Sequence, residues 1–373
     1  MKIGIPKERQ EAERRVAATP DTVKRYAGMG LEVVVESGAG AGAAISDEAF
    51  TAAGASLGDE AAAWAADIVL KVQRPTDEEM ARLRAGQLLI GSLDPYNHKE
   101  QVQAYATAGA TAFAMELLPR TTRAQAMDVL SSQANLAGYK AVVDAMAEYG
   151  RVMPMMMTAA GTVTPAKVFI VGAGVAGLQA IATARRMGAV VTATDVRPAA
   201  REETESLGAK FVGFVPADAA TSGGYARPLT PEEQAEQAKM VAEHLKGQDI
   251  VVTTAQIPGR TAPRIVTAEM VKSMKSGSVV LDMAAESGGN VEGSKPGKTV
   301  TVGGVKLIGA RNLASRIAPA TTVLYAKNLF NFVQLLLDPK SKELKIDTAD
   351  DLIKGTLLTS GGEVVHDAFK PAA

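Results

Sequence analysis

The chain has 373 residues, of which 47% are hydrophobic and 22% charged, so it can bury a sizeable core and is long enough for two domains. A formal net charge of −1 argues against a nucleic-acid partner, and the absence of cysteine excludes disulfides, thiol nucleophiles and Cys-ligated metals. The three histidines, His98, His244 and His366, show no metal-ligand spacing. No apolar run reaches the roughly 18 residues of a spanning helix, and residues 1–10 do not resemble a signal peptide, so we expect a cytoplasmic protein without a metal site.

The first 115 residues alternate between strand and helix patterns. Predicted strands occupy residues 2–6, 31–36, 67–72, 88–93 and 111–115, and predicted helices occupy residues 20–29, 61–66, 77–83 and 99–108. Thr19 is the expected N-cap of the first helix, because Pro20 follows it at a position that tolerates proline. This βαβα order predicts an open parallel sheet with helices on both faces.

A glycine-rich run, residues 37–43, follows the second predicted strand and matches a loose G-x-G-x-x-A pattern. Residues 45–48 then begin a separate short helix with its own cap. The glycines therefore do not lead directly into a long helix, which a phosphate site requires. We interpret this run as a structural turn.

Residues 116–133 are polar and irregular, and they are interrupted by a proline. The side chains of interest in this stretch are Arg120, Arg123, Gln125 and Asp128. Polar residues this dense between a strand and a helix are typical of a loop that meets a ligand, although the local pattern fits a capped surface loop equally well.

A helix predicted over residues 134–149 is a suitable connector between two domains. Met153 and the methionines at 155–157 follow it. A methionine cluster of this kind is more typical of core packing than of a cofactor site.

A short apolar strand over residues 167–171 is followed at once by a G-x-G-x-x-G turn and an alanine-rich helix. In this motif Gly172 allows the tight turn, Gly174 lets a pyrophosphate approach the backbone, and Gly177 lets helix and strand pack closely. The helix start then offers free N–H groups and a positive dipole end to the phosphates. The pattern predicts a dinucleotide-binding turn.

A second strand, residues 189–194, ends on Asp195. A carboxylate there can accept hydrogen bonds from the adenosine ribose hydroxyls and would repel a 2′-phosphate, which favours NAD(H) over NADP(H). Arg197 weakens this preference, because a nearby arginine can accommodate the phosphate.

The rest of the second half supplies further strands over residues 210–215, 249–254, 279–282 and 305–309. Residues 217–237 form a long polar stretch that is typical of a mobile lid or of a solvated excursion. In that stretch Tyr225 follows two glycines and could fold over a nucleotide. Ala255 lies at the carboxyl end of a predicted strand, where ligands bind in such sheets.

The C-terminal segment combines an apolar helix over residues 322–337 with a hairpin predicted over residues 356–365. The nucleotide domain already has its strands, so we expect this segment to rejoin the first domain. The predicted fold is therefore α/β, with two Rossmann-like, doubly wound parallel-sheet domains and a cleft between them. The expected domains are residues 1–133 with 318–373, and residues 134–317.

Taken together, these motifs resemble the NAD(H)-binding subunits of proton-translocating nicotinamide nucleotide transhydrogenases over essentially the whole chain. The matching stretches are KIGIPKE, ERRVAATP, LKVQRP, AMELLPRTTRAQAMDVLSSQANLAGYKAV, PMMMTAAGT, GAGVAGLQAIATARRMGAVVTATDVR, SGGYA, LDMAAESGGN and YAKNLFNF. The RAQ-MD segment joined to SSQ-NLAGY is the most specific of these matches. It separates this family from its relative, alanine dehydrogenase, which shares the fold.

The resemblance implies a role for each matching residue. The loop that approaches the nicotinamide and its ribose is matched by Arg120, Gln125 and Asp128, which would position the ring without acid or base chemistry. Ser131 matches a residue near the carboxamide, the three glycines match the pyrophosphate turn, and Tyr225 matches the tyrosine of a mobile loop. The full set of predicted cofactor-binding residues is Arg120, Gln125, Asp128, Ser131, Gly172, Gly174, Val175, Gly177, Asp195, Val196, Arg197, Gly224, Tyr225 and Ala255.

The same resemblance implies partners. The protein would be a homodimer, peripheral on the inner face of the membrane through separate proton-channel subunits. A separate NADP(H)-binding component would be the hydride partner, and the expected reaction is direct hydride transfer from NADH to NADP⁺ coupled to proton translocation.

Two alternatives remain open at this point. Arg15 and Lys71 match the substrate-binding positions of alanine dehydrogenase, and Glu286 falls near its catalytic Asp. Its catalytic His should fall near residues 92–94, where this chain has none, and a dehydrogenase that makes an imine or ketone needs a general acid or base. We therefore expect Arg15 and Lys71 to be structural. The second alternative is a non-catalytic NAD-sensing module.

Overall fold

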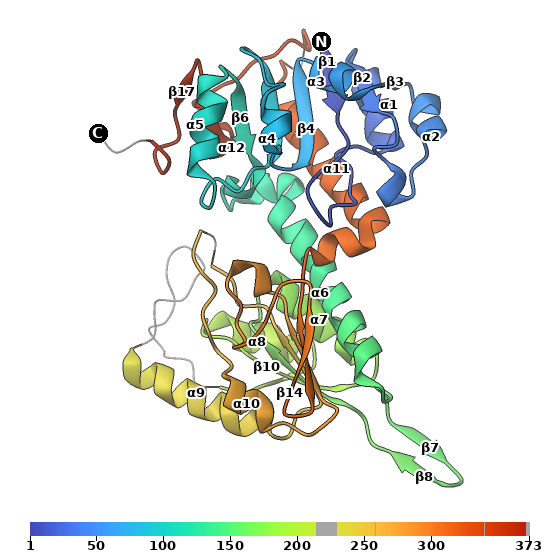
Figure 1. The fold of residues 1–373 in the computed structure, drawn as a ribbon, viewed down its shortest axis with the longest axis vertical. Coiled ribbons are helices and arrows are strands. Elements are labelled where there is room, and N and C mark those ends of the chain that lie inside the picture. The colour runs from blue at the N-terminus through green and yellow to red at the C-terminus, as the bar shows by residue number, and fades with distance from the viewer. Residues whose placement is uncertain (214–229, 258, 339, 371–373) are drawn as a thin grey trace. The chain divides into compact units, whose positions relative to one another are not determined.

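The computed structural model describes residues 1–213, 230–257, 259–338 and 340–370 (Figure 1). It contains two compact units, the first formed by Met1–Gln133 with Ala314–Ala373 and the second by Ala134–Leu313. Each unit has a central sheet of mostly parallel strands packed against helices. The predicted α/β class with two doubly wound sheets is confirmed.

The described part of the first unit forms an eight-stranded sheet in the order β17-β16-β6-β5-β4-β1-β2-β3. Its first six strands run parallel to their neighbours: β1 (Lys2–Ile5), β2 (Glu32–Glu36), β3 (Ser56–Gly58), β4 (Ile68–Gln73), β5 (Leu88–Ser92) and β6 (Thr111–Ala114). The C-terminal hairpin, β16 (Leu357–Ser360) and β17 (Glu363–Val364), adds to the sheet antiparallel beside β6. The short strand β3 was not predicted, because three residues leave no readable alternation.

Helices cover both faces of this sheet: α1 (Pro20–Gly28), α2 (Asp47–Ala52), α3 (Glu60–Trp64), α4 (Asp77–Met80), α5 (Lys99–Thr107), α11 (Ala318–Leu335) and α12 (Asp351–Thr356). Thr19 caps α1 as predicted, in a reciprocal capping box with Thr22. The side chains of α1 and α11 fill one face of the sheet, while Trp64 of α3 and Tyr105 of α5 fill the other. The helix α11 begins four residues earlier than predicted, because its first turn accepts a proline.

The described part of the second unit forms a seven-stranded sheet in the order β11-β10-β9-β12-β13-β15-β14. Its strands are β9 (Lys167–Val171), β10 (Val190–Thr194), β11 (Lys210–Phe211), β12 (Ile250–Thr253), β13 (Val279–Asp282), β14 (Thr299–Val302) and β15 (Val305–Gly309). All neighbours are parallel except β14, an edge strand that was not predicted. The direction in which the chain winds reverses between β9 and β12, which makes their boundary the topological switch point.

The helices of this unit are α7 (Val175–Arg186), α8 (Ala199–Ser206), α9 (Pro231–Leu245) and α10 (Ala268–Lys272), together with most of α6 (Val129–Tyr149). The prediction of a loop through residue 237 was wrong at its end. A capping box between Thr230 and Glu233, with Pro231 at the first position, starts α9 there. The rest of that predicted loop, residues 214–229 with Gly224 and Tyr225, lies outside the described residues.

A two-stranded hairpin, β7 (Met156–Thr158) and β8 (Gly161–Val163), extends from the second unit (Figure 1). Every residue of both strands is exposed, and Met157 keeps 79% of its surface accessible to solvent. The prediction that the methionine cluster packs a core was therefore wrong for residues 155–157. Only Met153 is buried.

Candidate functional site

The glycine turn of the second unit lies at its switch point, as the motif requires. The turn leaves the carboxyl end of β9, and α7 begins directly after it at Val175. The neighbouring strand β12 is paired in parallel with β9 and ends beside the turn, so Ala255 lies against Gly172. In open α/β sheets this crevice is where ligands bind.

The three glycines of this turn have three different physical reasons. Gly172 has φ +99°, and a Cβ there would lie 2.6 Å from the Thr254 hydroxyl. A Cβ on Gly177 would lie 1.9 Å from the carbonyl oxygen of Gly172, so only glycine lets the helix close on the turn. A Cβ on Gly174 would meet nothing within 4 Å. Space for a ligand is therefore left open at Gly174, where the motif places the pyrophosphate.

Asp195, after β10, ties the turn to the neighbouring strand. Its Oδ2 accepts the Ala173 N–H at 2.7 Å, and its Oδ1 accepts the Arg197 N–H at 2.8 Å. The Arg197 guanidinium lies 3.1 Å from Oδ1 and donates to the Ala173 carbonyl at 2.8 Å. Arg197 is thus held on the carboxylate, which weakens its ability to receive a 2′-phosphate.

Asn290 was missed from the sequence although it organises this crevice. The side chain is fully buried, and its amide accepts the Ala255 N–H at 3.0 Å and donates to the Ala255 carbonyl at 2.8 Å. It also donates to the Pro263 carbonyl at 2.9 Å. Its only sequence signal was its place at the end of the matching stretch LDMAAESGGN.

In the first unit, the segment after β6 forms 3₁₀ turns, Met115–Leu117 and Thr122–Met127. Ala124 and Met127 are buried in the core of the unit. Gln125, between them, is exposed, and its side-chain amide makes no hydrogen bond within the described residues. Arg123 pairs with Asp350 and Asp351 at the start of α12, so it anchors the segment and leaves Gln125 open to solvent.

The helix that follows this segment begins at Val129, five residues earlier than predicted. Asp128 acts as its N-terminal cap, because its carboxylate accepts the Ser131 N–H at 2.9 Å and the Ser131 hydroxyl at 2.5 Å. Ser131 therefore lies in the first turn of α6 and not in a loop. Arg120, Gln125, Asp128 and Ser131 belong to one segment of the first unit, and the other described site residues belong to the second.

The switch point of the first unit, between β1 and β4, is filled by the chain itself. Lys71 of β4 is fully buried, with its Nζ 2.8 Å from Glu79 and 3.2 Å from Glu8. Glu8, which follows β1, also accepts the Val72 N–H at 2.6 Å. Burial raises the pKa of Glu8 to about 7, against the opposing effect of the Lys71 charge.

Arg15 is held in the same way. Its Nε and Nη2 donate to the two oxygens of Glu13 at 2.8 and 2.7 Å, and its Nη1 donates to Gln133 at 2.8 Å. The guanidinium also lies over the ring of Tyr325, 5.7 Å from its centroid. A bidentate arginine is the usual receptor for a carboxylate, and here an internal carboxylate occupies it.

The glycine run at residues 37–43 is a packed turn, as interpreted. It contains the 3₁₀ turn Ala41–Ala43, and α2 begins separately at Asp47 with Ser46 as its cap. A Cβ on Gly40 would lie 2.6 Å from the Ile45 carbonyl, and one on Gly42 would lie 2.5 Å from the Arg14 carbonyl. No space is left at either glycine for a phosphate.

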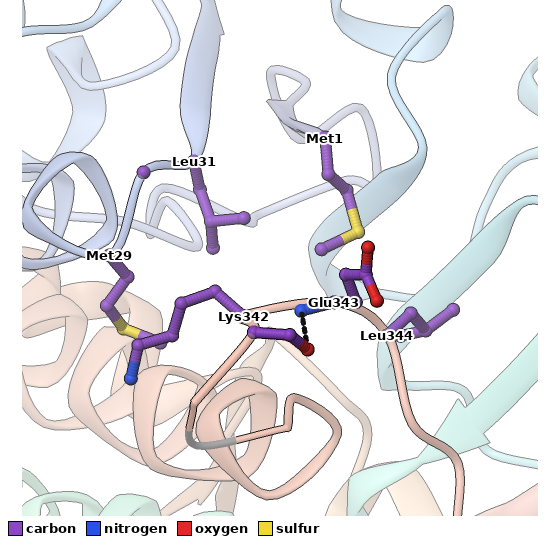
Figure 2. A pocket seen from close by; sticks show the side chains of 8 residues that line it. Met1, Met29, Leu31, Lys342, Glu343 and Leu344 are labelled. Carbon is purple, nitrogen blue, oxygen red and sulfur yellow. Dashed lines mark hydrogen bonds between the residues drawn. The ribbon is translucent and has the colours of Figure 1, made fainter.

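A pocket of about 410 Å³ lies near the amino ends of β1 and β2, bordered by Met1, Leu31 and Leu344 (Figure 2). It is away from every predicted site residue and offers no catalytic group. Among the described residues, no cluster of histidine and carboxylate side chains is arranged to hold a metal ion. Over the same described ranges, no helix combines the length and apolar character needed to cross a bilayer.

Comparisons with known proteins agree on one family. Residues 4–137 match the alanine dehydrogenase/PNT N-terminal domain, and residues 141–367 match the alanine dehydrogenase/PNT C-terminal domain. The chain is 50% identical over 379 residues to the first of the polypeptides that make up NAD(P) transhydrogenase subunit alpha in Rhodospirillum rubrum, covering 99% of both chains.

Solved structures and a more distant relative give the same order of similarity. The fold superposes on the crystal structure of transhydrogenase from Sinorhizobium meliloti with a TM-score of 0.90 at 54% identity, covering 98% of this chain and 100% of that one. An alanine dehydrogenase of Halomonas elongata is 30% identical over 381 residues, covering 100% of this chain and 96% of its own. The predicted resemblance is confirmed, with alanine dehydrogenase as the more distant relative.

Proposed function

The chain belongs to the alanine dehydrogenase/PNT family, and from that premise we propose that it is the NAD(H)-binding subunit of a proton-translocating transhydrogenase. In this proposal NADH bound to this chain gives a hydride directly to NADP⁺ on a separate component. The two electrons and the hydrogen move together from one nicotinamide to the other, so no proton is exchanged with the protein.

Cofactor binding is assigned to the open turn of the second unit. Gly172, Gly174, Val175 and Gly177 would receive the pyrophosphate at the start of α7. Asp195, with Val196 and Arg197 beside it, would receive the adenosine ribose, and its negative charge favours NAD(H). Ala255 would line the crevice from the neighbouring strand.

The observation that carries the choice between the two branches of the family is the occupied switch point of the first unit. An alanine dehydrogenase needs cations free to receive a substrate carboxylate. Here Arg15 is paired with Glu13, and Lys71 is buried between Glu8 and Glu79. Glu286, the remaining candidate for acid–base work, accepts the Asn312 N–H at 2.8 Å, and about half of its side chain is exposed to solvent.

The segment of the first unit supplies orientation in this proposal. Gln125 and Arg120 would position the dihydronicotinamide, while Asp128 and Ser131 would contact its ribose and carboxamide. The nicotinamide carries the chemistry, so the protein needs only to hold the ring in a reactive geometry.

We further propose a homodimer that uses the hairpin of β7 and β8. A lone two-stranded hairpin is at best marginally stable in water, and this one presents Met155, Met156, Met157 and Val163 to solvent. The same patch on a second copy is self-complementary in a two-fold dimer. Met157→Lys should shift the protein toward monomer in analytical ultracentrifugation, whereas Val190→Lys, at an exposed residue of β10, should leave its mass unchanged.

Two assays test the enzymatic proposal. In the first, the protein is mixed with NADH, pyruvate and ammonia and no second protein, and we expect no NADH oxidation. In the second, NADPH, the acetylpyridine analogue of NAD⁺ and an isolated NADP(H)-binding component are added, and we expect reduction of the analogue. Robust turnover in the first assay would establish an amino-acid dehydrogenase, and no transfer in the second would favour an NAD sensor.

A variant separates orientation from binding. Gln125→Asn should slow hydride transfer by about tenfold or more while NADH affinity stays within a few fold, because the exposed amide acts on geometry and not on the phosphates. Gln103→Asn, at an exposed glutamine of α5, is the matched control and should change neither quantity. Equal losses of rate and affinity in Gln125→Asn would show that Gln125 is only a binding residue.

The membrane component of the proposal rests on the family alone. Proton translocation would require channel subunits separate from this chain, which would attach it to the inner face of the membrane. Co-purification with a membrane protein and an NADP(H)-binding partner would support it, and a protein that elutes alone from a mild detergent extract would contradict it.

A further inference from the structure

Asn328 of α11 links the two ends of the segment that carries Gln125, Asp128 and Ser131. The side chain is 7% exposed. Its Nδ2 donates to the Ala126 carbonyl at 2.9 Å, and its Oδ1 accepts the Ser132 hydroxyl at 2.7 Å.

These two contacts use both ends of one amide. Ala126 directly follows Gln125 in the 3₁₀ turn, and Ser132 directly follows Ser131 in the first turn of α6. An amide supplies a donor and an acceptor in one plane, whereas a carboxylate has no donor and an aliphatic side chain has neither. Asparagine is therefore the residue type that can hold a carbonyl and a hydroxyl across this span.

The support behind Asn328 is rigid. The helix α11 packs through Tyr325, Leu329 and Phe332 into the core of the first unit, and all three side chains are almost fully buried. The segment thus rests on a helix that the core fixes. Its exposed side chain, Gln125, is placed by backbone that Asn328 holds.

We propose that Asn328 is a positioning residue for hydride transfer, which fixes the backbone on both sides of the nicotinamide-binding segment. The inference rests on the proposed function. Because a misplacement of about 1 Å costs on the order of a hundredfold in rate, a residue that never touches the cofactor can control the chemical step.

The chain contains a matched control. Asn331, one turn further along α11, also donates to the Ala126 carbonyl, at 2.8 Å, but it makes no contact with Ser132. Removing Asn331 takes away one bond to the same carbonyl and leaves the bridge intact. A difference between the two asparagines therefore reports on the bridge.

The test compares Asn328→Asp, Ser132→Ala and Asn331→Asp, each assayed with the NADP(H)-binding component at saturating NADH. Asn328→Asp keeps an acceptor for Ser132 but turns a carboxylate toward the Ala126 carbonyl. We expect its hydride-transfer rate to fall about tenfold or more, with NADH affinity within about threefold of wild type. Ser132→Ala, which introduces no buried charge, should lower the rate by about threefold to tenfold, and Asn331→Asp by less than about threefold.

Hydrogen exchange gives a readout that does not depend on activity. Amides of residues 121–132 should exchange faster in the Asn328 and Ser132 variants than in wild type, and the Asn331 variant should not differ from wild type. Unchanged rates in both bridge variants would overturn the proposal. A rate that falls only in proportion to NADH affinity would also overturn it. Failure of the wild-type protein to bind NADH would instead contradict the proposed function, and the exchange experiment would still test the bridge.

Discussion

The two units arrange their first five parallel strands in the same order, yet they use the switch point in opposite ways. In the first unit the crevice between β1 and β4 is closed by Glu8, Lys71 and Glu79, and the nearby glycine run packs against Arg14. In the second unit the crevice between β9 and β12 keeps open space at Gly174. One fold therefore provides a structural half and a binding half, and the difference lies in whether polar groups satisfy one another or remain for a ligand.

This comparison predicts a separation of effects. Changes at the first switch point should alter stability and leave NADH binding intact, while a change at Gly174 should do the reverse. The following variants test that separation in order of the expected effect on stability.

Lys71→Met should have the largest effect. It leaves Glu8 and Glu79 buried without their cation, which costs about 3–5 kcal/mol of unfolding free energy. Urea unfolding followed by circular dichroism measures the loss, and Lys24→Met on exposed α1 is the control. NADH affinity of the folded variant should stay within about twofold; a large loss of affinity would give Lys71 a role in the binding site.

Gly42→Ala tests the packed turn. Its Cβ would lie 2.5 Å from the Arg14 carbonyl, a backbone atom that cannot move alone, so we expect a loss of about 1–3 kcal/mol. Gly28→Ala, where the Cβ meets nothing within 4 Å, should be neutral or slightly stabilising. Isothermal titration should give wild-type NADH affinity for both variants, and weakened binding in Gly42→Ala would mean that this turn contacts the cofactor.

Glu116→Gln tests a buried carboxyl group after β6. Burial raises the pKa of Glu116 to about 7, and its Oε2 has no hydrogen-bond partner among the described residues. A raised carboxyl pKa stabilises the fold fully below the unfolded value near 4.5, and this contribution is lost as pH rises toward 7. The variant should therefore gain on the order of 1–2 kcal/mol relative to wild type between about pH 4.5 and pH 8. Parallel unfolding profiles of the two proteins over this range would contradict the shift.

Gly174→Ala should have almost no effect on stability, because its φ of −71° suits alanine and its Cβ side is open. NADH affinity should fall about tenfold or more, since the methyl group occupies the space left for the pyrophosphate. Calorimetry and thermal unfolding measure the two quantities on one sample. Wild-type affinity in this variant would move the pyrophosphate away from the turn.

Local patterns in the sequence predicted the glycine turn of the second unit well. The strand Lys167–Val171 was predicted to the residue, and each of the three glycines has the geometry that the motif assigns to it. The reason is that a strand, a turn and a helix start are set by neighbours in the chain. The packed turn at residues 37–43 was separated from the dinucleotide motif by the same local argument.

Features that depend on distant contacts could not be predicted. Lys71 and Glu79 are eight residues apart, but Glu8 reaches Val72 across 64 residues, and Asn328 reaches Ala126 across 202. Single amides such as Asn290 and Asn328 have no periodicity to read. The start of α6 was misplaced because Asp128 was considered as a ligand contact and not as a cap.

The most direct test of the account follows the transferred hydrogen. NADH deuterated at both C4 positions is mixed in ordinary water with this protein, NADP⁺ and the NADP(H)-binding component, and the NADPH formed is analysed by mass spectrometry. Direct hydride transfer without an acid or base predicts one deuterium in every NADPH molecule. NADPH that carries no deuterium would contradict the account, because the hydrogen would then have passed through the protein or the solvent.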